Sequence, residues 1–369
     1  MINLIVLQPT SLCNLNCSYC YVPNRKDKTK LNLTILESIF NKTLNSDLVS
    51  NFVEFLWHAG EPLTVGLKYF ENALELQKKY NRSGKHIVNT IQTNGTLLND
   101  DWCRFFKLNS FNIGISIDGP AHLHDKIRVT WGNKPSLKNA LQGAALLRSH
   151  GIKPGVVCVL TNDSLSYPLE IFNFFYENEL NWVAFNVEEI EHANQTSSLN
   201  TESKTIEKFT YFISTFYDLW EKNITSFNVR EFSDLISSIR QKQKSTNFSR
   251  KPLETQKDGI LTFDKYGNIS PYSPEFSGVK SERYEDFIIG NIKINSIEDV
   301  FYSNAYKRIN NSVRISVESC KNNCEYFDLC GGAFLSNKFF ENGDIESTET
   351  TTCKLKVQTI TDVILSKLN

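Results

Sequence analysis

The sequence has little of what secreted, membrane-spanning or nucleic-acid-binding proteins need. Its N-terminus has no basic segment followed by a small-residue cleavage site, and the apolar run that begins at Ile2 is too short to span a bilayer. Neither charge is in excess, because 40 Lys and Arg residues stand against 41 Asp and Glu residues, for a net charge of −1. No long-range field therefore favours nucleic acid or an acidic membrane. We expect a cytoplasmic protein that has neither nucleic acid nor a membrane among its partners.

Cysteine, in contrast, is abundant, with nine residues in a chain of 369. In a chain without signs of secretion, such cysteines indicate metal binding or catalysis rather than disulfides. Most of them form two groups, one near each end of the chain, whereas Cys103 and Cys158 lie in apolar surroundings that predict core positions. The length and the 40% hydrophobic content are enough for one large domain and a smaller one.

Strand-like and helix-like segments alternate through the first half of the chain. Such alternation is typical of parallel strands joined by right-handed helical crossovers. Six units of this kind are too few for a closed eight-stranded barrel, so we predict an α/β fold with a partial, TIM-like (β/α)6 barrel. The expected strands are residues 2–9, 53–58, 87–92, 112–117, 153–160 and 182–187, and the expected helices are residues 31–45, 66–80, 99–108, 135–150 and 165–177.

The chain changes character after these units. Helical patterns at 202–222 and 228–243 lead into a polar, lysine-rich segment at 242–257, which is followed by short strands at 259–263 and 268–270. The predicted domains are a barrel core at 1–225, a helical bridge and linker at 226–258, a small cysteine-rich module at 259–353 and a C-terminal helix at 354–369.

Three cysteines, Cys13, Cys17 and Cys20, stand close together after the first expected strand. An iron–sulfur cube takes four ligands, so three thiolates leave one iron open to a small molecule. The loop lies at the carboxyl end of its strand, which is where α/β barrels place their chemistry. A structural zinc loop is the alternative, although a closed zinc site needs a fourth ligand nearby.

The spacing of these cysteines, with Tyr19 before the third, resembles that of the radical S-adenosylmethionine (SAM) superfamily. The segment His58-Ala59-Gly60-Glu61-Pro62 resembles the Gly-Gly-Glu-Pro motif of the same superfamily, with Ala59 in place of the first glycine. On its own, Gly-Glu-Pro is also compatible with a simple turn. The resemblance implies that the cysteine loop binds a 4Fe–4S cluster, that SAM occupies the open iron, and that the motif holds the amino group of SAM.

Polar residues follow the third and fourth strands at the points where these strands end. Turn chemistry alone accounts for Asn94 and Asp118, because Asn-Gly and Asp-Gly are common turn pairs. The resemblance implies more: Ser116 contacts the ribose or the methionine part of SAM, and Arg128 pairs with its carboxylate through the planar guanidinium fork. The SAM-binding residues that we predict are His58, Gly60, Glu61, Thr93, Asn94, Ser116, Arg128 and Leu160.

A second cysteine group, Cys320, Cys324, Cys330 and Cys353, is large enough to close another cluster with no ligand position left open. Four thiolates also satisfy tetrahedral zinc. The region resembles the SPASM/Twitch extensions of peptide-modifying radical SAM enzymes, which implies iron rather than zinc. Tyr272 stands where those extensions carry a further cysteine, so we predict one auxiliary 4Fe–4S cluster and about eight irons per chain.

The segments Cys324–Gly332 and Leu7–Arg25 also resemble the cyclophane-forming radical SAM peptide maturases. The resemblance implies that a 5′-deoxyadenosyl radical takes a Cβ hydrogen from a ribosomally made precursor peptide, and that this carbon then bonds to an aromatic ring. A base must take the ring proton, and Asp118 and Glu275 are the predicted catalytic residues on the basis of their location.

The same resemblance implies three partners: the precursor peptide, an external electron donor such as flavodoxin or ferredoxin, and a separate leader-recognition protein unless the enzyme binds the leader directly. Two alternatives stay open. One is another radical SAM modification of a peptide, namely a thioether or ether crosslink or sulfatase formylglycine formation. The other is a non-catalytic Fe–S electron-transfer protein, against which the predicted SAM pocket argues because an electron carrier needs no such pocket.

Overall fold

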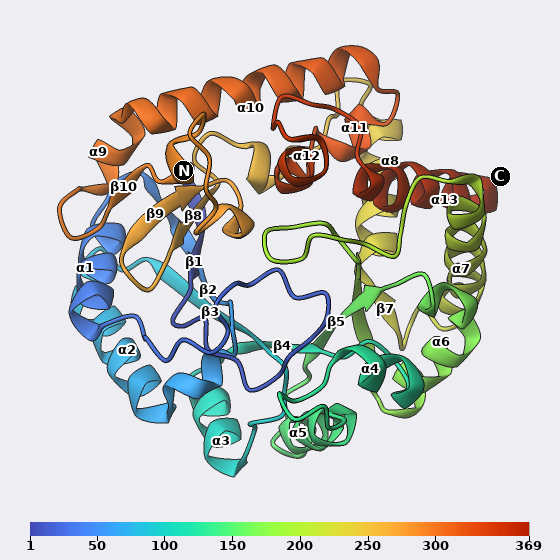
Figure 1. Cartoon of the computed structure of the whole chain (residues 1–369), viewed down its shortest axis with the longest axis horizontal. Helices are drawn as coiled ribbons and strands as arrows, with labels where there is room; N and C mark the ends of the chain where they lie inside the picture. Colours follow the sequence, from blue (N-terminus) through green and yellow to red (C-terminus); the bar gives the residue numbers. More distant parts are fainter. Residues whose placement is uncertain (369) are drawn as a thin grey trace.

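The computed structural model describes residues 1–368, and its centre is a single ten-stranded sheet. Six parallel strands are neighbours in chain order, which confirms the predicted α/β fold with a partial barrel. Figure 1 shows these strands along an arc, with the loop that follows the first strand inside it. The strands are β1 (Ile2–Leu7), β2 (Val49–Trp57), β3 (His86–Thr93), β4 (Asn112–Ser116), β5 (Gly155–Leu160) and β6 (Trp182–Val187).

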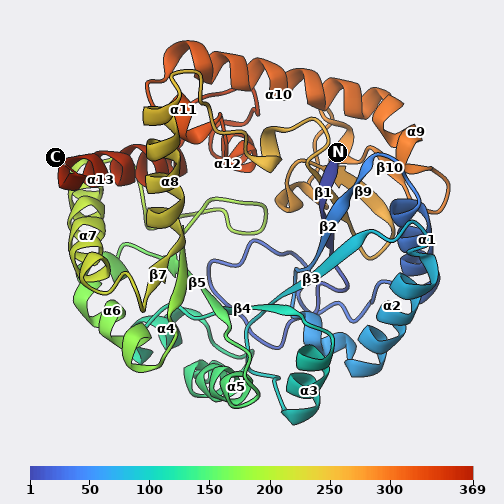
Figure 2. The ribbon, with the colours of Figure 1, turned by 180° about the vertical axis from the view of Figure 1, so that it is seen from behind.

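Helices cover the outer side of this arc, as the views from the two sides show (Figures 1 and 2). Two of them begin at asparagines that cap free backbone N–H groups: the Asn32 side chain accepts from Thr34 N, and that of Asn99 accepts from Trp102 N. The helices are α1 (Leu33–Leu44), α2 (Leu67–Tyr80), α3 (Asp100–Leu108), α4 (Ala121–Ile127), α5 (Leu137–Ser149), α6 (Pro168–Glu177) and α7 (Ser203–Lys222).

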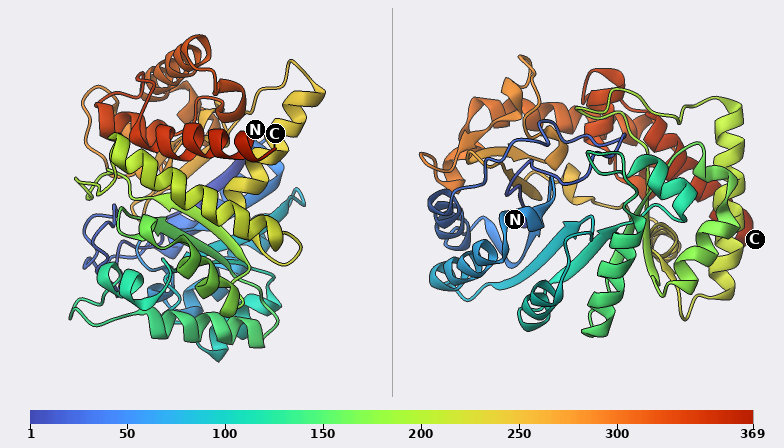
Figure 3. Two further views of the ribbon diagram at one scale, coloured as in Figure 1. Left: turned by 90° about the vertical axis from the view of Figure 1, so that its right-hand side faces the viewer. Right: turned by 60° about the horizontal axis from the view of Figure 1, so that its bottom comes forward.

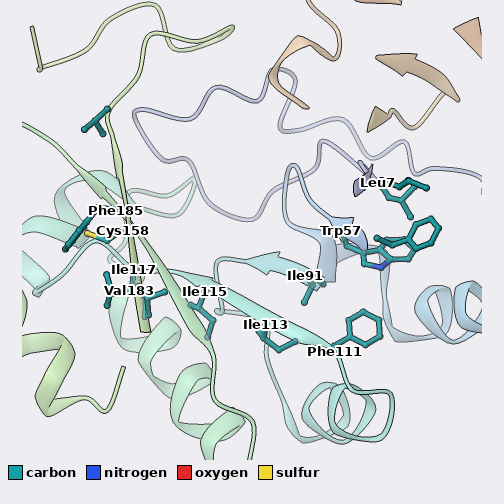
Figure 4. Packing of buried hydrophobic residues seen from close by; sticks show 14 of the residues in the cluster. Leu7, Trp57, Ile91, Phe111, Ile113, Ile115, Ile117, Cys158, Val183 and Phe185 are labelled. Carbon is teal, nitrogen blue, oxygen red and sulfur yellow. The ribbon is translucent and has the colours of Figure 1, made fainter. Parts of the chain in front are cut away.

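Buried aromatic and aliphatic side chains fill the space between the sheet and the helices (Figure 4). Trp57, at the end of β2, is fully buried and packs on Phe70 of α2 with 4.9 Å between the ring centroids. Its indole N–H donates to Asn89 Oδ1 at 3.0 Å, so the burial leaves no polar atom unpaired. Cys103 and Cys158 are fully buried in the same core, as predicted.

The short strands of the cysteine-rich region continue the barrel sheet instead of forming a sheet of their own. β8 (Ile260–Phe263) pairs in parallel with β1, and β9 (Asn268–Pro271) and β10 (Gly290–Asn291) extend the sheet beyond it. The region is therefore anchored to the strand whose end carries the cysteine loop. At the opposite edge lies β7 (Asn228–Val229), followed by α8 (Arg230–Lys244). The domain boundaries given above stay a prediction.

The sequence patterns predicted no helix between residues 271 and 353, yet the structure has four α-helices there. The longest, with 20 residues, is capped by Ser303, whose side chain accepts from Tyr306 N. Its buried face includes Ser312 and Ser316 besides apolar residues, so its hydrophobic periodicity is weak. These helices are α9 (Ile297–Tyr302), α10 (Asn304–Asn323), α11 (Phe327–Cys330) and α12 (Leu335–Asn342).

The predicted C-terminal helix begins as a π-helical stretch, Cys353–Thr359, and continues as α13 (Ile360–Leu368). Figure 3 shows α13 alongside α7, so the end of the chain packs back on the barrel. No helix within residues 1–368 has the length and apolarity needed to cross a membrane. Short 3-10 turns lie at Pro62–Val65, Ser164–Ser166, Leu253–Thr255, Pro274–Phe276 and Glu285–Phe287.

Candidate active site and cluster sites

A cavity of about 420 Å³ opens at the carboxyl ends of the parallel strands. The cysteine loop and the residues that follow β2, β3 and β4 form one wall, and the segment after β6 and the turn Pro274–Phe276 form the other. A larger cavity of about 1190 Å³ lies at the amino ends of β4 and β5 and contains no cysteine. The predicted site residues that line the smaller cavity are Cys13, Cys17, Cys20, His58, Gly60, Thr93, Asn94, Ser116, Arg128 and Glu275.

The backbone of the cysteine loop is held from both ends. Cys13 N donates to Arg25 O at 3.0 Å, and the Arg25 guanidinium donates to Cys17 O at 3.1 Å. On the outer side, Trp131 Nε1 donates to Cys13 O at 2.9 Å. All three thiols are free, and burial raises the pKa of Cys13 to about 12. Free thiols on one cavity wall fit a cluster, whose positive irons would replace the thiol protons.

The turn after β2 packs directly on this loop. Gly60 has a φ of +57°, and a Cβ atom at this position would lie 2.6 Å from Leu12 O. Glu61 N donates to the same carbonyl at 2.8 Å. Ala59 also has a left-handed backbone, with a φ of +75°, at the position where the superfamily motif has its first glycine. The glycine at position 60 is therefore needed for the close approach of this turn to the cysteine loop.

Glu61 connects two neighbouring strands of the barrel through a buried carboxylate. Its side chain is fully buried, and its two oxygens accept from Thr93 Oγ1 at 2.7 Å, Asn94 N at 2.7 Å and Leu63 N at 3.0 Å. Burial raises the pKa of Glu61 to about 7 against these hydrogen bonds. The carboxylate thus ties the end of β2 to the end of β3, and its predicted contact with the SAM amino group stays a prediction.

Asp118 and Arg128 form a buried ion pair beside the cysteine loop. Arg128 Nε donates to Asp118 Oδ2 at 2.8 Å, and Arg128 Nη2 donates to Oδ1 at 3.2 Å. Tyr19 OH and Val159 N donate to the same carboxylate at 2.6 Å and 3.0 Å. Burial alone would raise the pKa of Asp118, but Arg128 and Tyr19 lower it below its usual value. These surroundings argue against the predicted role of Asp118 as a base and favour a role in positioning Arg128.

Two more predicted contacts lie on the cavity wall. Ser116 Oγ accepts from Gln92 Nε2 at 2.9 Å, and His58 Nδ1 lies 3.2 Å from Tyr21 OH. Burial lowers the pKa of His58 to about 4, so its ring is neutral at physiological pH.

Leu160, in contrast, does not reach the cavity. It is fully buried in the hydrophobic core, whereas Val157 and Val159 of the same strand line the cavity. Successive residues of a strand point to opposite faces, so the side chain of Leu160 lies on the core side of β5, and its predicted contact with SAM stays a prediction.

An acidic cluster, consisting of Glu189, Glu191 and Glu275, faces the cysteine loop across the cavity. Burial raises the pKa of Glu189 to about 7, although the nearby Lys356 opposes the shift. Burial also raises the pKa of Glu191 and of Glu275. Only Glu275 was predicted. The sequence Glu188-Glu189-Ile190-Glu191 directly after an expected barrel strand was the signal for the other two.

The second cysteine group comes from three helical elements. Cys320 lies in the last turn of α10, Cys324 caps that helix, Cys330 ends α11, and Cys353 starts the π-helical stretch. Burial raises the pKa of Cys353 to about 12, and the other three thiols raise it further, which shows that the four groups lie within electrostatic reach of one another. Within residues 1–368 no three His, Cys, Asp or Glu side chains are arranged to hold a single metal ion.

Comparison with known sequences identifies the family. A profile of the radical SAM superfamily matches residues 7–175, a range that includes the cysteine loop, Glu61, Ser116 and Arg128. The chain belongs to the radical SAM superfamily. It is therefore a radical SAM enzyme, and its cofactors are SAM and a 4Fe–4S cluster.

The alignments with two curated relatives cover nearly the whole chain of this radical SAM enzyme. The uncharacterized protein sll1766 of Synechocystis is 39% identical over 99% of this chain and 92% of its own. The serine-type anaerobic sulfatase-maturating enzyme of Bacteroides thetaiotaomicron is 28% identical over 95% of this chain and 86% of its own.

Two solved structures show that the fold is shared. The structure of anSMEcpe with bound AdoMet and Cp18Cys peptide has a TM-score of 0.80 at 22% identity, over 100% of this chain and 98% of that one. Streptococcus suis SuiB bound to precursor peptide SuiA has a TM-score of 0.68 at 17% identity, over 96% of this chain and 76% of that one.

Proposed function

We propose that this radical SAM enzyme modifies a ribosomally made precursor peptide and forms a three-residue cyclophane. In that product, a carbon–carbon bond joins a Cβ atom to an aromatic ring two positions away. The observation that carries the proposal is that one cavity is lined by both the cysteine loop and a cluster of carboxylates, of which Glu191 is buried. The first would support hydrogen abstraction and the second would take up the ring proton. An electron carrier needs neither.

The residues on the first wall fit the cofactors of the superfamily. Cys13, Cys17 and Cys20 would hold the cluster, and Ser116 and Arg128 would hold SAM. Arg128 is suited to this role because Asp118 fixes its guanidinium at the cavity wall. When bound and reduced, these cofactors supply a 5′-deoxyadenosyl radical, which removes one hydrogen atom from the peptide. The protein orients the peptide and excludes water from the buried site.

Ring closure removes two hydrogens from the peptide. One leaves as the abstracted atom; the other leaves the aromatic ring as a proton, together with one electron. Glu275 would accept the proton, because its carboxyl lines the cavity and its raised pKa brings it closer to neutral pH. Ser273 donates a hydrogen bond to this carboxyl and orients it. The second cysteine group would hold one auxiliary cluster that takes the electron, and a donor such as flavodoxin or ferredoxin would reduce the first cluster.

Formylglycine formation on a sulfatase is the second candidate function, because a sulfatase-maturating enzyme matches 95% of this chain. Oxidation of a serine side chain to an aldehyde also removes two hydrogens, so intact mass alone does not separate the two products. The crosslink introduces no aldehyde and resists fragmentation between the joined residues. The aldehyde reacts with aminooxy reagents and fragments normally.

The decisive experiment is co-expression with a candidate precursor peptide, followed by tandem mass spectrometry. We expect a product lighter by two hydrogens, without backbone fragments between the joined residues and without reaction with an aminooxy probe. Deuterium placed at the Cβ position should appear in 5′-deoxyadenosine. An aminooxy adduct, with normal fragmentation, would establish the sulfatase-type reaction instead.

A matched pair of variants tests the proposed base. Glu275→Gln should still cleave SAM but give little crosslinked product, whereas Glu282→Gln, an exposed carboxylate of the same region, should behave as the wild type. Unchanged product from Glu275→Gln would eliminate Glu275 and leave Glu189 as the next candidate.

A further inference from the structure

A lysine is buried beside the second cysteine group. Lys338, in the first turn of α12, is only 2% exposed. Its ammonium donates to Ser316 Oγ at 3.0 Å, to Gly332 O at 3.0 Å and to Cys320 Sγ at 3.2 Å. An ammonium has three N–H donors, and here each of them has one acceptor. The side chain is therefore fixed in place, with one donor directed at a sulfur.

The charge of this ammonium has no counter-ion in hydrogen-bond contact. Its acceptors are a hydroxyl, a carbonyl and a thiol, and no carboxylate within residues 1–368 forms an ion pair with it. The half-buried Glu254 acts on it only through space. A buried charge without a partner is costly, and lysine is rarely buried unless it is paired. The position therefore calls for an anion at the cysteine group.

We infer that Lys338 is the counter-ion of the auxiliary cluster and that its N–H···S bond to Cys320 raises the reduction potential of that cluster. The inference rests on the proposed function, in which the four cysteines hold a 4Fe–4S cluster. Four thiolates give such a cluster a net negative charge, and reduction adds one more. A fixed ammonium at a ligand sulfur stabilises the reduced form more than the oxidised form, since potential follows net charge and hydrogen bonds to the sulfurs.

A higher reduction potential of the auxiliary cluster would favour the proposed crosslinking reaction. Ring closure ends with the release of one electron from the peptide, and a higher potential favours its transfer to the auxiliary cluster. The ammonium also lies close to a second ligand, since its acceptor Gly332 O belongs to the turn two residues after Cys330. Lys338 is thus a positioning and tuning residue that acts through the cluster without touching the peptide.

The test is a potentiometric titration, monitored by electron paramagnetic resonance, of the variant Cys13→Ala/Cys17→Ala/Cys20→Ala, which keeps only the auxiliary cluster. In this background, Lys338→Met should weaken reduction at least tenfold, which is a midpoint about 59 mV more negative for one electron. Lys338→Arg keeps the charge and should stay near the parent value. Lys321→Met is the matched control, because Lys321 follows Cys320 but is exposed to solvent, and its midpoint should not move.

An unchanged midpoint in Lys338→Met, with its iron content intact, would overturn the inference. If Lys338→Met fails to hold iron while Lys338→Arg holds it, the counter-ion role is supported by cluster assembly itself. If neither variant holds iron, Lys338 is a folding residue and the inference is wrong. Failure of the parent background to hold any cluster would instead refute the auxiliary cluster of the proposed function, so the two failures are distinguishable.

Discussion

The two cysteine groups are built in different ways. Cys13, Cys17 and Cys20 lie in one short loop, and local contacts with Arg25 and the turn at Gly60 fix its shape. The second group is assembled from the end of α10, from α11 and from the π-helical stretch, so only the packing of these helices brings its thiols together. The cysteines of the first group are therefore contiguous in the sequence, whereas tertiary structure alone brings those of the second group together.

The electrostatic environments of the two groups differ as well. The sulfur of Cys13 accepts from neutral donors, Leu15 N at 3.4 Å and Asn94 Nδ2 at 3.9 Å, and the nearby Arg128 is neutralised by Asp118. The sulfur of Cys320 accepts from an ammonium. Because a positive donor favours the reduced cluster, this difference predicts a lower potential at the cysteine loop than at the second group. A low potential is what the reduction of SAM requires.

The largest expected effect comes from removing the cysteine loop. The variant Cys13→Ala/Cys17→Ala/Cys20→Ala should produce no 5′-deoxyadenosine, and its iron content should fall from about eight to about four per chain. Quantitative iron and sulfide analysis, together with chromatography of the nucleoside products, measures both quantities. Retention of SAM cleavage would contradict the assignment of the loop, and zinc in place of the remaining iron would contradict that of the second group.

The second group should separate SAM cleavage from product formation. Cys353→Ala should lose the auxiliary cluster and the crosslinked product but retain cleavage of SAM, because the cysteine loop is intact. Cys103→Ala is the matched control: Cys103 is fully buried but belongs to neither group, so the variant should keep both clusters and lose about 1 kcal/mol of stability. Normal crosslinking by Cys353→Ala would remove the auxiliary cluster from the reaction.

The buried ion pair beside the cysteine loop should matter for folding. Asp118→Asn leaves the Arg128 guanidinium buried without a counter-ion, so we expect a loss of about 3–5 kcal/mol in the free energy of unfolding. Asp163→Asn breaks the exposed pair with Lys126 and should cost about 1 kcal/mol or less. Urea unfolding of the two variants measures the difference. Equal losses would mean that Arg128 finds another partner.

Two neighbouring residues should respond very differently to an exchange between glycine and alanine. Gly60→Ala places a methyl group 2.6 Å from Leu12 O, so the cysteine loop has to move and SAM cleavage should fall about tenfold or more. Ala59→Gly relieves a left-handed backbone at the cost of chain entropy, so stability should change by about 1 kcal/mol or less. Steady-state assays and thermal unfolding test both. An active Gly60→Ala would show that the loop tolerates displacement.

The last prediction concerns the pH dependence of stability. Burial raises the pKa of Glu189 to about 7 in the folded protein, above its value of about 4.3 in an unfolded chain. The folded state then binds the proton more tightly, so this group's contribution is fully present below pH 4 and is lost as the pH rises through 7. Glu189→Gln should therefore flatten the fall in stability between about pH 4 and 7. A slope unchanged from that of the wild type would show that Glu189 ionises normally.

The barrel strands were predictable because each is an apolar run followed by turn residues at its carboxyl end. The predicted strand at 182–187, for example, has the bounds of β6. The pairing of β8 with β1 was not predictable, because nothing local in residues 260–263 specifies a partner near residue 4. α10 was missed because buried serines such as Ser316 weaken its hydrophobic pattern.

The residue types of the candidate site were predictable from spacing, but their hydrogen-bond partners were not. The predicted contact of Glu61 with SAM is untested, and the sequence did not show that its carboxylate also joins the ends of β2 and β3. Asp118 was expected to act as a base, whereas it pairs with Arg128. Such choices depend on which donors the fold brings within 3 Å, and a linear sequence does not state this.

The parallel pairing of β1 with β8 has a consequence for the order of events during synthesis. β1 is synthesised long before β8, so one of its two edges stays open until residues 260–263 have followed. The strand that carries the cysteine loop therefore has one unpaired edge until β8 has been synthesised. Iron inserted before that point would enter an unfinished scaffold, so the fold favours cluster loading after translation, and chaperones have an exposed edge to protect in the meantime.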